Sequence, residues 1–95
     1  MEFIIKENSR VAKIASKKLG AAKMAVVIGR TIHLYKTTRR EFLQNETWVK
    51  HELCHVQQFK KYGTIIFIAK YLLESILHGY HNNKYEVEAR NAEMN

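Results

Sequence analysis

The first third of the chain alternates between a helical spacing of apolar residues and two short β-rich runs. Residues 9–19 place apolar side chains three or four positions apart, which predicts a short amphipathic helix with a basic outer face. Gly20 follows as a plausible terminator. Residues 25–28 and 31–35 are rich in β-branched residues and flank Gly29-Arg30. This arrangement predicts a β-hairpin, and a glycine at the first turn position suits a type II′ turn.

The remaining two thirds of the chain have helical patterns. Residues 38–41, Thr-Arg-Arg-Glu, match a capping box and predict one long helix that ends near residue 62, before Gly63. Its expected core stripe is Phe42, Val49, Leu53 and Val56. We expect a second, strongly apolar helix over residues 64–77 and a loop over 78–82. Asn83 can cap a last helix that reaches about residue 93.

These elements predict a single domain that spans residues 1–95, because no linker, repeat or low-complexity run divides the chain. The order is helix, hairpin, long helix, apolar helix and final helix. It predicts an α+β fold that is mostly helical, with the small hairpin packed beside the long helix.

Composition and charge exclude some classes of protein. The chain has 95 residues and one cysteine, so an intramolecular disulfide is excluded. The formal net charge of +7 is carried by scattered lysines and arginines, without the aromatic residues that single-strand binders interleave among them. We therefore expect a solvated basic surface and no specific nucleic-acid partner.

The most hydrophobic stretch, residues 62–77, is interrupted by Lys70 and Glu74 and is shorter than a membrane span. It predicts a buried or interfacial helix and no transmembrane segment; a second copy of the chain can pack against it as a homodimer. Residues 1–10 lack the pattern of a secretory signal, so the expected location is cytoplasmic.

One pentapeptide suggests a chemistry: His51-Glu52-Leu53-Cys54-His55. In a helix, residues four apart lie on one face, so the two imidazoles can bind the same Zn²⁺. Glu52 then lies beside the metal, where it can accept a proton from bound water as general base. Cys54 lies off the face that the histidines share and is interpreted as a small, buried apolar residue.

A catalytic zinc usually has three protein ligands and leaves one position for water. The candidates for the third ligand follow His55 in the chain. They are His78, His81, Glu86, Glu88 and Glu93.

Two separated motifs give the chain a resemblance to known metallopeptidases. The stretch Tyr85-Glu86-Val87-Glu88-Ala89 resembles the second signature of gluzincins, found in CAAX-type membrane proteases and in peptidases that cleave phage repressors. From His51 onward the chain also resembles small uncharacterised bacterial HExxH proteins with a zincin-like fold. The residues that match their pattern are His51, Glu52, His55, Gln58, Gly79, Tyr80, Asn83, Tyr85, Glu86, Glu88 and Ala89.

The resemblance implies a zinc-dependent metallopeptidase that acts on a peptide or protein substrate. Its register implies Glu86 as the third zinc ligand, with Glu88 as the fallback. It also implies that the strand over residues 31–35 offers a free edge to an extended peptide. Candidates for a second oxyanion donor are Tyr80, Tyr85 and His33.

Each site residue also has a structural interpretation. Glu86 can complete the cap at Asn83 or pair with Arg90, and Glu88 can pair with Lys84. His51, His55 and Glu52 can be solvated helix residues, and Gln58 can either hydrogen-bond a ligand or lie on the surface.

For the whole protein there are two rival functions. One is a zinc-stabilised interaction module without catalysis, because a short chain has little material for a cleft. The other is a binder of nucleic acid or anionic membranes, which would use the N-terminal helix and the apolar segment.

Overall fold

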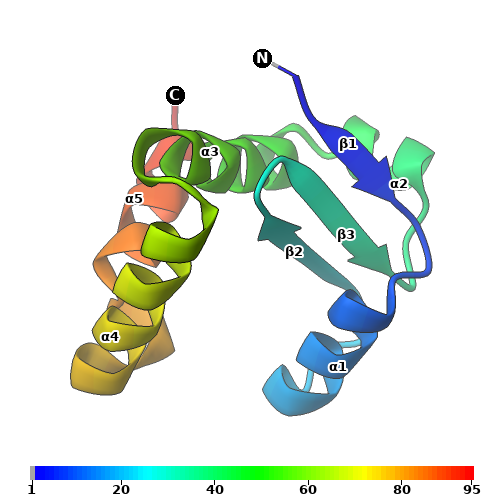
Figure 1. The fold of residues 1–95 in the computed structure, drawn as a ribbon. Helices are drawn as coiled ribbons and strands as arrows, with labels where there is room; N and C mark the ends of the chain where they lie inside the picture. The colour runs from blue at the N-terminus through cyan, green and yellow to red at the C-terminus, as the bar shows by residue number, and fades with distance from the viewer. Residues whose placement is uncertain (1) are drawn as a thin grey trace.

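The structure is a computed structural model that describes residues 2–95. It consists of a small sheet surrounded by helices, which confirms the predicted α+β class (Figure 1). The strands are β1 (Ile4–Lys6), β2 (Met24–Ile28) and β3 (Thr31–Tyr35). The helices are α1 (Arg10–Leu19), α2 (Arg39–Gln44), α3 (Glu46–Tyr62), α4 (Thr64–Asn82) and α5 (Lys84–Ala92).

The sheet has the order β1-β3-β2, with β1 parallel and β2 antiparallel to β3. The predicted hairpin is confirmed, and Gly29 has the positive φ, 64°, that a type II′ turn requires at this position. Strand β1 was not predicted, because its three residues are too few to show an alternating pattern. This strand pairs with β3, so the expectation of a free edge at β3 is wrong. Strand β3 is thus the central strand, and β1 and β2 form the two edges of the sheet.

The two faces of the sheet are covered by different helices. Ile32 and Leu34 are fully buried and share a face, since side chains alternate along a strand. They belong to the core cluster that also contains Phe42 of α2 and Val56 of α3. The other face is turned toward α1, where Ser9, the N-cap of that helix, hydrogen-bonds His33 at 2.8 Å.

The single long helix expected from residue 38 onward is two helices. The capping box at Thr38 is present, but it opens the short α2. Asn45 interrupts the helix: its backbone is non-helical, and its side chain accepts a hydrogen bond from the backbone N–H of Trp48 at 3.1 Å. Asparagine favours this capping conformation over a helix interior, so α3 starts afresh at Glu46.

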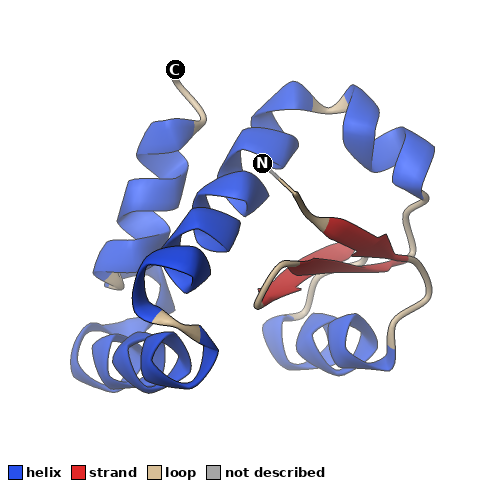
Figure 2. Cartoon of the chain, turned by 45° about the horizontal axis from the view of Figure 1, so that its top comes forward, coloured by secondary structure: helices blue, strands red, loops and turns tan. Residues whose placement is uncertain are grey.

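Helix α4 continues past the expected end at Leu77, so the segment 78–82 is helical rather than a loop. Gly79 breaks the helix locally with φ 80° and ψ 167°, a conformation that favours glycine. Asn83 then caps α5, as predicted, and α5 runs back alongside α3 (Figures 1 and 2). None of the described helices is long and apolar enough to cross a membrane.

Candidate metal centre

Helix α3 carries both histidines on the side that α5 covers. His55 is buried and His51 is half-buried, and their rings lie 5.1 Å apart in an edge-to-face arrangement. Their separation of four residues places them on successive turns of the same face. Glu52, also buried, follows His51 and faces the open side of the same region.

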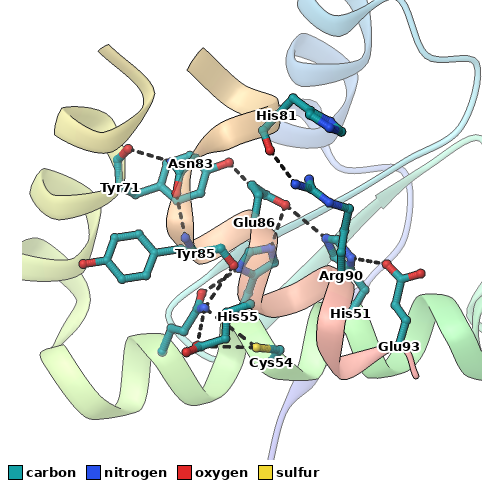
Figure 3. Close-up of polar contacts among 12 residues, drawn as sticks. His51, Cys54, His55, Tyr71, His81, Asn83, Tyr85, Glu86, Arg90 and Glu93 are labelled. Atoms are coloured by element: carbon teal, nitrogen blue, oxygen red, sulfur yellow. Dashed lines mark hydrogen bonds and ion pairs between the residues drawn. The ribbon is translucent and has the colours of Figure 1, made fainter. Parts of the chain in front are cut away.

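Helix α5 brings Glu86 to the histidines from 35 residues after His51 and 31 residues after His55. The helix packs through a stripe of three buried residues: Tyr85, Glu86 and Ala89. Ala89 is fully buried, and its small side chain lets the two helices approach closely. As a result the Glu86 carboxylate points at both imidazoles (Figure 3).

The three side chains fit a zinc ion in donor type and in spacing. Glu86 Oε1 lies 3.1 Å from Nε2 of His51 and 3.3 Å from Nε2 of His55. Two ligands at about 2.1 Å from a tetrahedral zinc lie roughly 3.4 Å apart, close to both distances. All three ligand atoms lie within 4.8 Å of one another. His51, His55 and Glu86 can therefore bind one Zn²⁺ with little rearrangement.

A chain of hydrogen bonds fixes the orientation of His55. The Gln58 amide nitrogen donates to the Tyr85 carbonyl at 3.1 Å and to Glu88 Oε1 at 2.7 Å. The Gln58 oxygen therefore accepts from Nδ1 of His55, which lies 2.8 Å away. In a neutral His55 ring this bond places the proton on Nδ1, so that Nε2 can bind a metal. Gln58 is thus a hydrogen-bond partner of a ligand candidate rather than a surface residue.

Glu93 orients His51 in the same way. Nδ1 of His51 donates to Glu93 Oε2 at 2.6 Å, on the other side of the ring from Glu86. Such pairing of a carboxylate with a metal-binding histidine holds the ring in place and makes its free nitrogen a better ligand. Glu93, one of the sequence candidates for the third ligand, therefore contacts His51 through the nitrogen that faces away from Glu86.

Tyr71 of α4 completes the surroundings of Glu86. Its hydroxyl donates to Glu86 Oε2 at 2.5 Å, which leaves Oε1 directed at the histidines. Glu86 makes no ion pair with Arg90, which donates instead to the His81 carbonyl at 2.5 Å. The cap of α5 comes from the side chain of Asn83, so neither structural interpretation accounts for the orientation of Glu86.

The cluster is strongly coupled electrostatically. Burial alone would raise the pKa of Glu86, but hydrogen bonds from His51, His55 and Tyr71 lower the pKa well below its usual range. Burial alone would lower the pKa of His51, yet hydrogen bonds to Glu86 and Glu93 outweigh it and raise that pKa to about 9. Without a metal, the positive charge of His51 stabilises the two carboxylates.

Glu52 has a different environment from Glu86. Burial raises the pKa of Glu52 to about 7, against the opposing effect of the two histidines. A carboxylate with a pKa near neutrality can both accept and release a proton, which a general base that later acts as an acid must do.

The site opens into a groove beside β2. His51 and Glu52 line two adjoining cavities of ≈ 350 and ≈ 560 Å³, and Met24, Ala25 and Tyr80 line both as well. The larger cavity follows β2 over its whole length, from Met24 to Ile28, and passes between α1 and α4. The groove is thus long enough for an extended chain to lie beside the three candidate metal ligands.

The other candidate residues lie elsewhere or have other contacts. His78 and His81 are exposed, and Glu88 contacts Gln58 and the Cys54 thiol. Cys54 is half-buried rather than buried, and burial raises its thiol pKa to about 11. Of the expected oxyanion donors, only Tyr80 lines the groove. Tyr85 is buried against Phe67, and His33 contacts Ser9.

Two neighbours of the site were not assigned these roles from the sequence: Tyr71 and, as an orienting carboxylate, Glu93. Tyr71 lies within an apolar stretch, where nothing distinguishes it from a core aromatic residue.

Comparison of the chain with protein-family models, curated proteins and solved structures found no match.

Proposed function

We propose that the protein is a zinc-dependent metallopeptidase in which His51, His55 and Glu86 bind the metal and Glu52 is the general base. The observation that carries this proposal is the convergence of both Nε2 atoms on one oxygen of Glu86 at the wall of a groove. The resemblance of the two motifs to gluzincin signatures points the same way.

The residues around the metal have distinct tasks. Bound zinc supplies a Lewis acid and acidifies a water molecule. Glu52 accepts the proton of the attacking water and then passes it to the leaving amine. Tyr80 stays protonated, since burial and the neighbouring Glu86 raise its pKa to about 12, so its hydroxyl can donate to the developing oxyanion.

The free edge of β2 supports an extended peptide as the substrate. In an antiparallel hairpin with a two-residue turn, hydrogen-bonded pairs alternate with pairs whose N–H and C=O groups point outward. Ile28 and Thr31 close the turn, so Ala25 and Val27 direct their backbone groups to the open edge. A peptide that pairs with these two residues would lie in the groove that passes His51 and Glu52.

A purely structural zinc site is the less well supported alternative. Structural zinc usually has four protein ligands, whereas the candidate cluster in the described part of the chain consists of three residues. The adjoining groove is also larger than a structural site needs.

The test measures zinc content and peptide hydrolysis in the same preparations. We expect about one zinc per chain and zinc-dependent cleavage of unfolded casein. Glu52→Gln should keep the zinc and lose roughly a hundredfold or more of the activity. Glu46→Gln makes the same change on the exposed first turn of α3 and should leave both unchanged. Full zinc content without any hydrolysis in the wild-type protein would favour the structural alternative.

A further inference from the structure

The outward face of α4 is apolar although it faces solvent. Phe67 is the only buried residue of this helix. Its exposed aliphatic residues are Ile65, Ile66, Ile68, Leu72, Leu73, Ile76 and Leu77. At 100° per residue these side chains occupy about half of the helix circumference. Solvent-facing helix sides are normally polar, so this apolar face of α4 is suited to an apolar environment.

The charges beside the apolar face of α4 are almost all basic. Lys70 is the exposed charge on α4 itself, while the half-buried Glu74 accepts a hydrogen bond from the backbone N–H of Lys84 at 3.0 Å. The last turn of α3, directly before α4, adds Lys60 and Lys61.

Helix α1 extends the same pattern across the groove. It lies on the same side of the molecule as α4 in both views (Figures 1 and 2). Its charged residues are all basic: Arg10, Lys13, Lys17 and Lys18. It also exposes Val11, Ile14 and Leu19. The two helices therefore combine apolar side chains with positive charge.

The combination of apolar side chains and positive charge favours an anionic bilayer over a second copy of the chain as the surface that covers α4. A second copy of the chain would bring a like net charge of +7 and further basic residues against the first. The surface of an anionic bilayer offers both an apolar layer and negative headgroups. Apolar side chains can enter the acyl boundary, while the long lysine side chains reach back to the headgroups.

We propose that the apolar face of α4 docks on the surface of an anionic phospholipid membrane, with the helix in the plane of the interface. The basic residues of α1 and of the end of α3 bind the headgroups. This docking uses no residue of the metal cluster and does not depend on the proposed peptidase activity.

The test is co-sedimentation of the full chain with lipid vesicles. We expect binding to vesicles of phosphatidylcholine and phosphatidylglycerol in equal parts, weakened by salt, and much weaker binding to phosphatidylcholine alone. The double variant Ile65→Ser/Ile76→Ser should bind the mixed vesicles at least about tenfold more weakly. These side chains are 81% and 80% exposed, so the fold should not change.

Two controls distinguish docking from general stickiness. Met94→Ser removes an apolar side chain that is 85% exposed beyond the end of α5, and it should bind vesicles like the wild type. Lys60→Gln/Lys61→Gln should weaken binding to the mixed vesicles only.

Three results would overturn the proposal. One is the absence of binding to the mixed vesicles at low salt, and another is equal binding by the Ile65→Ser/Ile76→Ser variant. The third is a dimer in sedimentation equilibrium that this variant abolishes, with no vesicle binding, which would assign the face to a second copy of the chain.

Discussion

His51 lies between two carboxylates: Glu93 binds Nδ1 at 2.6 Å and Glu86 faces Nε2 at 3.1 Å. The two nitrogens therefore have separate tasks, because the hydrogen bond that Nδ1 donates to Glu93 keeps the proton of a neutral ring on Nδ1 and leaves Nε2 for a metal. The same division holds at His55, where Gln58 takes the place of Glu93.

Removing the Glu93 carboxylate should weaken metal binding without removing a ligand. We expect Glu93→Ala to lower zinc affinity about 10- to 100-fold, since the His51 ring loses its orientation and part of its basicity. A competition titration with a zinc-binding dye measures the change. Glu2→Ala removes an exposed carboxylate near the N-terminus and should bind zinc like the wild type. Equal affinities in the two variants would contradict the orienting role.

Glu86 and Glu88 should respond differently to the same substitution. Glu86→Gln replaces the carboxylate that faces both histidines, and it should abolish stoichiometric zinc binding in dialysed protein. Glu88→Gln should keep the zinc, because Glu88 contacts the Gln58 amide and not the histidines. The readout is metal content by elemental analysis. The reverse result would show that the register of the α5 motif is wrong by two residues.

Asn83 joins α4 to α5, and its loss should destabilise the fold. Its side chain accepts from the Tyr85 N–H at 2.9 Å and donates to the Tyr71 carbonyl at 3.0 Å and to Ser75 Oγ at 2.9 Å. The residue is fully buried, so Asn83→Ala removes three hydrogen bonds from the interior of the protein.

We expect this substitution to lower the free energy of unfolding by about 2–4 kcal/mol. Urea denaturation measures it. Asn91→Ala, an exposed asparagine in α5, should stay within about 0.5 kcal/mol of the wild type. A loss of similar size in both variants would argue against the joining role of Asn83.

His33 should make the protein less stable in mild acid. Burial, aided by the charge of Lys6, lowers the pKa of His33 below its ordinary value of 6.5. The unfolded chain therefore binds a proton more readily than the folded one. The stabilising contribution is present above pH 6.5 and is lost as the pH falls through the folded-state pKa.

Urea denaturation at pH 7.5 and pH 5.5, with chelator present, tests this prediction. The wild type should lose more stability between these pH values than His33→Gln does, whereas the exposed His78→Gln should follow the wild type. An equal loss in wild type and His33→Gln would refute the assignment to His33.

Much of the local structure could be predicted because it depends on near neighbours in the sequence. The turn at Gly29, the capping box at Thr38 and the cap at Asn83 each form through residues a few positions away. The shared face of His51 and His55 follows in the same way from the repeat of the α-helix. Two local predictions were wrong: Asn45 interrupts the predicted long helix, and residues 78–82 are helical rather than a loop.

The amino-acid sequence by itself determined the helices, the hairpin and the pair of imidazoles, since these arise from backbone geometry and short-range hydrogen bonds. Tertiary structure decided which glutamate faces the histidines, because Glu86 and Glu88 differ only in the side of α5 that packs on α3. It also decided that Tyr71 and Glu93 reach the site and that β2 forms the edge beside it. These contacts join residues far apart in the chain, and their formation depends on how α4, α5 and the sheet pack around α3.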